Sequence, residues 1–138
     1  MVRVIMVVGL GIDLVELDRV GEMLERWGDR LIEKLMDPAE AHALPRSGLE
    51  RSTAVAQAIA GKEAASKALG TGWSHGVQWR HVVVDTRAPE VRLEGRAGAV
   101  ARARGARPRG PLWLETRGNL VLAEFRLVSE APCEDKKE

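Results

Sequence analysis

Apolar and polar positions along the first third of the chain predict one strand and two helices. Residues 2–10 are apolar nearly throughout, a pattern typical of a strand that is covered on both faces. From Leu17 to Trp27 the apolar residues recur at helical spacing, so we expect a helix that ends at Gly28. A second short helix is expected over residues 29–35.

The strongest helical signal is an alanine-rich segment from residue 50 to residue 69. Alanine has the highest helix propensity, and its small side chain lets a helix pack closely against a sheet. Gly70 stands where a C-terminal cap is expected. Earlier in the chain, Asp37 and Pro38 are typical of an N-cap and a first-turn proline, which predicts a short helix up to residue 44.

The second half of the chain predicts short strands around one further helix. Strands are expected at residues 80–86, 90–93, 112–116 and 120–128, and a short helix at residues 95–104. The turn signal Gly118-Asn119 joins the last two strands as a hairpin. This order of elements predicts an α+β domain, with a mainly antiparallel sheet packed against the long central helix. The domain is expected to span residues 1–128, and the polar residues 129–138 to form a flexible C-terminal tail.

Composition narrows the class of protein. Of the 138 residues, 45% are hydrophobic and 30% are charged, which is typical of a folded globular protein and argues against a disordered one. The net charge of +1 gives no general attraction to nucleic acid or to a membrane, so neither is expected as a partner. The single cysteine, Cys133, predicts a reducing compartment. Asp13 and Glu16 follow the apolar N-terminus at once, which favours a buried strand over a signal peptide and predicts a cytoplasmic protein.

Five arginines form the strongest basic cluster of the sequence. One interpretation is a nucleic-acid surface, but no aromatic residues alternate with these arginines. A solvated helix face is the favoured interpretation, and docking of an acidic protein is the second. The cluster consists of Arg96, Arg102, Arg104, Arg107 and Arg109.

Asp13, Glu63 and Lys67 are the candidate chemical groups. Glu63 and Lys67 are four residues apart on the predicted central helix, so they share one face near its C-terminal end. Asp13 follows the first predicted strand, which places its carboxylate at a strand end. Two carboxylates from separate elements, with a lysine beside one of them, suit a hard divalent cation and a phosphate group. Each residue alone also fits an ordinary role, Asp13 as a helix cap and the other two as an exposed ion pair.

Gly9 and Gly11 stand just before Asp13. A Gly-x-Gly pair invites a dinucleotide-binding interpretation, but the full pattern needs a third glycine where Leu14 stands. We therefore reject that interpretation. The expected role of the two glycines is a tight backbone turn directly before Asp13.

Two blocks of the sequence resemble the holo-[acyl-carrier-protein] synthases, a family of the 4′-phosphopantetheinyl transferase superfamily. Residues 9–20 match the N-terminal block of that family almost position for position, and residues 62–72 match its signature helix and glycine loop closely. Residues 34–40 and 91–97 are similar more loosely. The resemblance extends over most of the chain up to about Val128 and implies the 4′-phosphopantetheinyl transferase-like fold.

The resemblance implies a magnesium-dependent transferase. Asp13 and Glu63 match the ligands of a Mg²⁺ ion that bridges them to the pyrophosphate of coenzyme A, and with Lys67 they form the implied catalytic set. The implied reaction transfers the 4′-phosphopantetheine arm of coenzyme A to a serine of an acyl carrier protein, as in fatty acid or polyketide biosynthesis. Positioning and charge neutralisation supply most of the catalysis in such a transfer. Either a water on the metal or a nearby carboxylate is expected to accept the serine proton.

Further residues gain a role from the same resemblance. Lys62 and Lys67 are expected to bring positive charge to the phosphates of coenzyme A. The loop formed by Gly70, Thr71 and Gly72 is expected to let coenzyme A approach the backbone closely.

Arg19 matches the position that contacts the acidic carrier protein in this family. The carrier protein is therefore the expected protein partner. The resemblance also implies a homotrimer, with active sites between its subunits.

The sequence departs from the family pattern at three positions. The family usually has an arginine and an aromatic residue where Ala58 and Ile59 stand, and a histidine near the nucleotide phosphates where Glu115 stands. These changes remove positive charge from the expected coenzyme A site. They leave a second hypothesis open, a catalytically degenerate paralogue that binds carrier proteins as a scaffold subunit.

Overall fold

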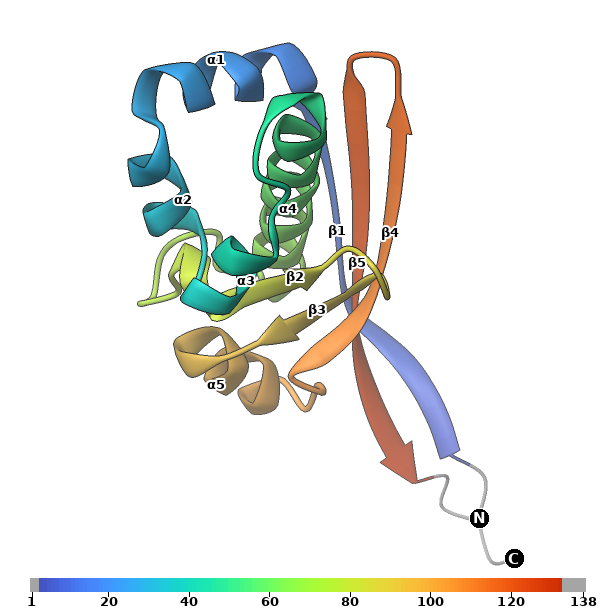
Figure 1. Ribbon diagram of the computed structural model, residues 1–138. Coiled ribbons are helices and arrows are strands. Elements are labelled where there is room, and N and C mark those ends of the chain that lie inside the picture. Colours follow the sequence, from blue (N-terminus) through green and yellow to red (C-terminus); the bar gives the residue numbers. More distant parts are fainter. Residues whose placement is uncertain (1–2, 133–138) are drawn as a thin grey trace, which may run out of the picture.

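Five antiparallel strands and one long helix dominate the computed structural model, which describes residues 3–132 (Figure 1). The strands lie in the order β1-β5-β4-β3-β2, and each neighbouring pair is antiparallel. This architecture confirms the predicted α+β class. The elements are β1 (Arg3–Glu16), α1 (Leu17–Trp27), α2 (Asp29–Leu35), α3 (Pro38–Ala43), α4 (Gly48–Leu69), the 3₁₀ turn η1 (Trp79–His81), β2 (Val82–Asp85), β3 (Glu90–Leu93), α5 (Gly95–Ala103), β4 (Arg109–Arg117) and β5 (Leu120–Pro132).

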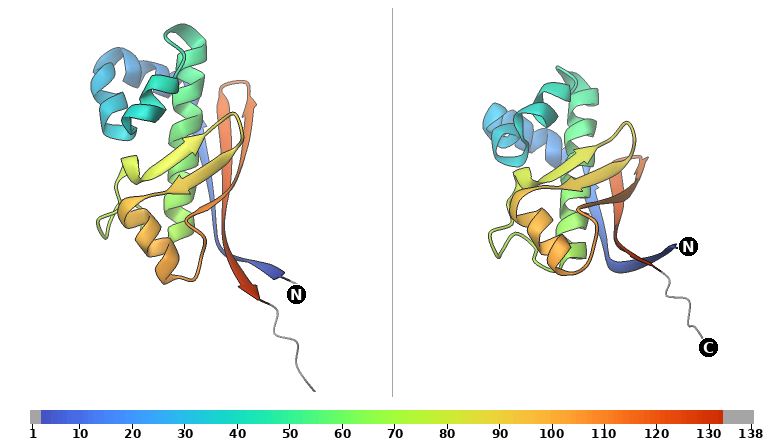
Figure 2. Two further views of the ribbon diagram at one scale, coloured as in Figure 1. Left: turned by 60° about the horizontal axis from the view of Figure 1, so that its bottom comes forward. Right: turned by 90° about the horizontal axis from the view of Figure 1, so that it is seen from below.

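The long helix α4 is the centre of the fold. It runs along the face formed by β1 and β5, and the β2–β3 hairpin crosses it from another side (Figures 1 and 2). Most of its buried residues are alanines, and Ala56, Ala60 and Ala64 are fully covered. The helix ends at Gly70, whose φ of 78° is the left-handed conformation predicted for its cap.

The contact between β1 and α4 is closest at Gly9 and Gly11. A Cβ atom at Gly9 would lie 2.2 Å from the carbonyl oxygen of Ala68, and one at Gly11 would lie 1.7 Å from that of Ala64. The predicted turn at these glycines is wrong, because β1 continues as one strand from Arg3 to Glu16. The glycines are needed because the backbones of strand and helix touch here and leave no room for a side chain.

One face of the sheet is uncovered in a single copy of the chain. The side chains of β1, β4 and β5 that point away from α4 form a surface that we call the outer face. It is rich in apolar residues and also carries Glu124 and Arg126, which form an ion pair with each other. Leu10, Ile12, Leu14 and Trp113 belong to it and are each 51–57% exposed. The prediction that the first strand is covered on both faces is therefore wrong for the isolated chain.

The short elements mostly follow their local sequence signals. Asp37 caps α3 as predicted, because its Oδ1 accepts a hydrogen bond from the backbone N–H of Glu40 at 2.7 Å. Several predicted bounds are wrong. Strand β1 runs to Glu16 instead of residue 10, and β4 covers Arg109–Arg117 instead of residues 112–116. Strand β2 begins at Val82 because the preceding residues form the turn η1, and residues 129–132 continue β5 instead of starting a tail. Positions 133–138 of the predicted tail lie outside the described residues.

The substitution Gly11→Ala is expected to destabilise the protein by about 3 kcal/mol, because the added methyl group must push β1 away from α4. The matched control is Gly21→Ala in α1, where nothing lies within 4 Å of an added Cβ atom. That control should stabilise the helix by about 0.5–1 kcal/mol. Urea unfolding measures both effects, and equal stability of the two variants would contradict the close packing.

Candidate functional site

A pocket of about 550 Å³ opens between β1, α1, α2 and α4, and we call it the carboxylate pocket. Its lining brings together Asp13 of β1 and Glu63 of α4, the two candidate carboxylates. Arg19 of α1 and Lys34 of α2 line the same pocket, so it carries both signs of charge. Much of the remaining lining is apolar and consists of Leu14, Val15, Val20, Met23, Leu31, Leu35, Ile59 and Trp79.

Asp13 lies inside β1, opposite Ala123 of β5. Its expected place at a strand end is therefore wrong, and so is the alternative role as a helix cap. Lys67 Nζ donates a hydrogen bond to Asp13 Oδ1 at 2.8 Å and another to the carbonyl oxygen of Ile12 at 3.2 Å. Because about half of the Lys67 side chain is exposed, its ammonium group is also open to an anionic ligand.

Asp13 and Glu63 fit a magnesium ion that takes its other ligands from water and from a bound phosphate. In proteins, Mg²⁺ is usually held by one or two carboxylates together with substrate phosphates. Two carboxylates from different elements in one pocket meet that requirement. Among residues 3–132, no cluster of three or more His, Cys, Asp or Glu side chains is placed to hold a metal ion.

Lys62 lies in the core and not at the carboxylate pocket. Its side chain is 0% exposed, and Nζ donates to Glu40 Oε1 at 2.9 Å, to the carbonyl oxygen of Trp79 at 3.1 Å and to that of Val82. These three acceptors match the three N–H groups of an ammonium. The expectation that Lys62 brings charge to the phosphates of a ligand does not fit this position, because its charge is already paired inside the protein.

Glu40 is the partner of Lys62, and both of its carboxylate oxygens are bonded. Oε1 also accepts from the backbone N–H of Asp37 at 3.3 Å, and Oε2 accepts from that of Val84 at 3.1 Å. Burial raises the pKa of the Glu40 carboxyl and lowers the pKa of the Lys62 ammonium, while the attraction between the two groups acts in the opposite direction. The sequence analysis gave Glu40 no role, since a glutamate three residues after Asp37 is also typical of a surface capping box.

The glycine loop after α4 ends the helix. The N–H of Gly70 donates to the carbonyl oxygen of Lys67 at 3.0 Å, and the N–H of Gly72 donates to that of Ser66 at 3.2 Å. Both amides are therefore bonded to the helix. Gly70, Thr71 and Gly72 are absent from the lining of the carboxylate pocket, so the expected contact of this loop with coenzyme A stays a prediction.

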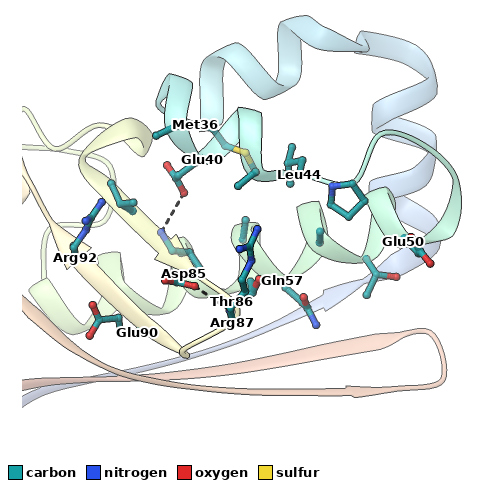
Figure 3. A pocket seen from close by; sticks show the side chains of 18 of the residues that line it. Met36, Glu40, Leu44, Glu50, Gln57, Asp85, Thr86, Arg87, Glu90 and Arg92 are labelled. Atoms are coloured by element: carbon teal, nitrogen blue, oxygen red, sulfur yellow. Dashed lines mark hydrogen bonds between the residues drawn. The ribbon is translucent and has the colours of Figure 1, made fainter.

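A larger pocket of about 870 Å³ lies between α3, α4 and the β2–β3 hairpin (Figure 3). Ala58, which replaces the arginine usual in the resembled family, is part of its lining. The guanidinium groups of Arg87 and Arg92 line the same pocket, and Figure 3 shows that both come from the hairpin. The same lining carries Glu40, Glu50, Asp85 and Glu90, so the pocket holds both signs of charge.

Glu115, the third departure from the family pattern, forms an ion pair on β4. Its Oε1 lies 3.0 Å from an Nη atom of Arg117. Both side chains are partly or largely exposed, so the pair contributes little to stability.

A stacked pair of tryptophans adjoins the carboxylate pocket. The ring centroids of Trp73 and Trp79 are 3.9 Å apart, and the ring planes differ by 19°. Trp79 lines the pocket, and Trp73 belongs to the loop after α4. This pair could not be predicted from the sequence, because two tryptophans six residues apart in an irregular segment follow no helical or strand period.

Arg104, a member of the basic cluster, has a structural role. It donates to the carbonyl oxygen of Ala68 at 2.7 Å and to that of Val8 at 2.6 Å, and so connects the C-terminal end of α5 to the last turn of α4 and to β1. Arg96 donates to the carbonyl oxygen of His75 at 3.1 Å. These two members of the cluster therefore bind the protein's own backbone, which weakens the nucleic-acid interpretation.

The chain is similar to known proteins in sequence and in structure. The profile of the 4′-phosphopantetheinyl transferase superfamily matches residues 9–107. A holo-[acyl-carrier-protein] synthase from Solidesulfovibrio magneticus is 45% identical over 104 residues, which cover 73% of this chain and 82% of that protein. The solved holo-[acyl-carrier-protein] synthase of Neisseria meningitidis has a TM-score of 0.76 at 26% identity, with coverage of 88% of this chain and 98% of that one.

A second solved structure is the holo-(acyl-carrier-protein) synthase of Bacillus anthracis in complex with CoA (3′,5′-ADP). Its TM-score is 0.66 at 29% identity, and the match covers 90% of this chain and 98% of that one. In the part of the chain that the structure describes, no helix has both the length and the apolar character needed to cross a bilayer.

The substitution Lys62→Met is expected to lower the free energy of unfolding by about 3 kcal/mol, because it leaves the buried carboxyl of Glu40 without its counter-charge. The matched control is Lys67→Met on the same helix. It removes an ion pair with a half-exposed lysine and should cost about 1 kcal/mol or less. Chemical denaturation of both variants makes the comparison, and equal losses would show that Lys62 is not the buried partner.

Proposed function

This chain belongs to the holo-[acyl-carrier-protein] synthases of the 4′-phosphopantetheinyl transferase superfamily, and we propose that Asp13 and Glu63 hold the Mg²⁺ ion of its reaction. The reaction transfers the 4′-phosphopantetheine arm of coenzyme A to an acyl carrier protein. The observation that carries the proposal is the meeting of these two carboxylates in one pocket, although they are fifty residues apart in the sequence. When bound, the metal ion neutralises charge on the pyrophosphate of coenzyme A.

The residues around the carboxylate pocket bind coenzyme A and offset the negative charge of its phosphates. The serine oxygen of the carrier protein bonds to the phosphorus that bears pantetheine, and the bond from this phosphorus to the bridging oxygen breaks. Adenosine 3′,5′-bisphosphate leaves with the negative charge. Lys67, fixed beside Asp13 and open to solvent, offsets that charge. The serine proton passes to water or to a carboxylate of the pocket, both of which are available in an open site.

The carrier protein docks beside the carboxylate pocket. Arg19 is exposed at the first turn of α1 and lines the pocket, so its guanidinium can bind an acidic side chain at the place where the serine must enter. Met23 and Ile59 supply apolar lining close to it. This combination of a cation and an apolar surface suits an acidic carrier protein. The enzyme is proposed to act in the cytoplasm.

We also propose that the protein is a homotrimer with its active sites between subunits. The outer face of the sheet supports this, because its apolar side chains are half exposed in the single chain. Exposed apolar side chains gathered on one face are typical of a protein–protein interface. A second copy of the chain that buries Leu10, Ile12 and Leu14 would remove them from water.

The substitutions Asp13→Ala and Glu63→Ala are each expected to reduce the rate of transfer roughly a hundredfold or more, because each removes charge that binds the ion and the phosphates. The fold should persist, since neither carboxylate is fully buried and such exchanges cost about 1 kcal/mol or less. Intact mass of an apo carrier protein, incubated with coenzyme A and Mg²⁺, measures transfer as a gain of about 340 Da.

The matched control for these two variants is Glu25→Ala, which removes an exposed carboxylate of α1 outside the pocket lining. It should leave the rate unchanged. Full activity of Asp13→Ala or Glu63→Ala would refute the metal site. If no apo carrier protein gains mass when it is incubated with the wild-type protein, the alternative function is favoured, a scaffold subunit that binds carriers without modifying them.

Sedimentation tests the trimer. At micromolar concentration the wild-type chain should sediment at three times its monomer mass of 15.1 kDa. Ile12→Glu, which puts a charge on the outer face, should shift it toward the monomer because a buried unpaired carboxylate is costly. A stable wild-type monomer at that concentration would refute the proposed assembly.

A further inference from the structure

The ammonium group of Lys62 connects three segments of the chain. Its hydrogen bonds reach Glu40 at α3, the carbonyl oxygen of Trp79 in the turn η1 and that of Val82 in β2. Glu40 extends the connection, because its Oε2 accepts from the backbone N–H of Val84 further along β2. Figure 3 shows this carboxylate and its bond to β2 at the wall of the larger pocket.

Of the segments that Lys62 connects, η1 lines the carboxylate pocket through Trp79, and α4, which carries Lys62 itself, lines it through Ile59 and Glu63. Glu63 follows Lys62 directly on α4, and Ile59 lies about one helical turn before it. Trp79 lines the pocket, and its carbonyl oxygen accepts a hydrogen bond from Lys62. One ammonium group thus fixes both the rotation of the helix that carries Glu63 and the location of an aromatic part of the wall.

A buried ion pair is not needed to hold these segments together. Desolvation of the two charges offsets much of their attraction, and apolar side chains of similar size often stabilise a core equally well or better. Apolar packing does not have the directional preference of a hydrogen bond. Each of the three bonds from Lys62 is made to an acceptor at a defined distance and angle, so a small rotation of α4 or a shift of η1 would break one.

We propose that Lys62 and Glu40 are positioning residues, which set the rotation of α4 and the location of Trp79 so that Glu63 faces Asp13 across the carboxylate pocket. Adjacent residues on a helix point about 100° apart, so a Lys62 side chain anchored in the core turns Glu63 sideways toward the pocket. This inference rests on the proposed role of Glu63 as a metal ligand. It assigns Lys62 a function through Glu63 and Trp79, without contact with the substrate.

The test compares the wild-type protein with the double variant Glu40→Leu/Lys62→Met, which removes both buried charges together. Binding of Mn²⁺ alone, measured by the electron paramagnetic resonance of the free ion, reports on Asp13 and Glu63. The circular dichroism band from exciton coupling reports on the Trp73–Trp79 stack. We expect Mn²⁺ affinity to fall roughly tenfold or more, as for other groups that orient metal ligands. The exciton band should weaken, and kcat should fall more than KM for coenzyme A rises.

Two further variants keep the test decisive. Phe125→Leu, a fully buried change in β5, should lower the melting temperature without altering Mn²⁺ affinity or the exciton band. Glu40→Gln keeps an oxygen acceptor for Lys62 and serves as the test if the double variant does not fold. Its Mn²⁺ affinity and its exciton band should then fall in the same direction by a smaller amount. Wild-type Mn²⁺ affinity and an unchanged exciton band in both variants at position 40 would overturn the inference.

The same measurements separate this inference from the proposed function. If the wild-type protein binds Mn²⁺ but transfers nothing to any carrier, the transfer reaction fails and the positioning role is still decided by metal affinity. If the wild-type protein binds no Mn²⁺, the role of Glu63 fails and this inference falls with it, while a weakened exciton band would then show a purely structural pair.

Discussion

The contact between β1 and α4 is the constraint on which the candidate site depends. At Gly9 and Gly11 the strand backbone touches carbonyl oxygens of the helix, and no other residue type leaves that space free. Asp13 lies two residues further along the same strand, on the same side, because side chains of a strand alternate in direction. Because of this close contact, the carboxylate of Asp13 lies within hydrogen-bond distance of Lys67 and in the pocket that Glu63 lines. The same short segment of β1 thus carries both the glycines that pack against α4 and the candidate carboxylate Asp13.

Local signals predicted most of the elements, and non-local contacts explain where prediction failed. Helix α1, the capped helix α3 and the alanine-rich α4 follow from periodicity and from end residues that act within a few positions. The two glycines were assigned to a turn because a turn is the commonest local reason for glycine. Their actual neighbours, Ala64 and Ala68, are more than fifty residues away, and no single-sequence pattern records such a contact.

The two lysines of the signature helix show that prediction from sequence was limited in the same way at the candidate site. Lys62 and Lys67 are both charged residues in one alanine-rich helix, and the family resemblance implied the same role for both. Five positions turn a helix by about 140° beyond one full turn, so the two side chains leave in different directions. One meets Glu40 inside the protein and the other meets Asp13 at the surface. The carboxylates, in contrast, were recognisable because two separate motifs each carried one.

The pairing of β1 with β5 joins the first strand of the chain to the last, with Val4 opposite Ala131 and Glu16 opposite Leu120. During synthesis on the ribosome, β1 emerges long before β5, its partner in the sheet. Contacts of such long sequence separation slow folding. An apolar strand that stays unpaired is prone to associate with other chains. The strand that supplies Asp13 is thus among the last parts of the sheet to be secured, and chaperone binding during translation would act first on this segment.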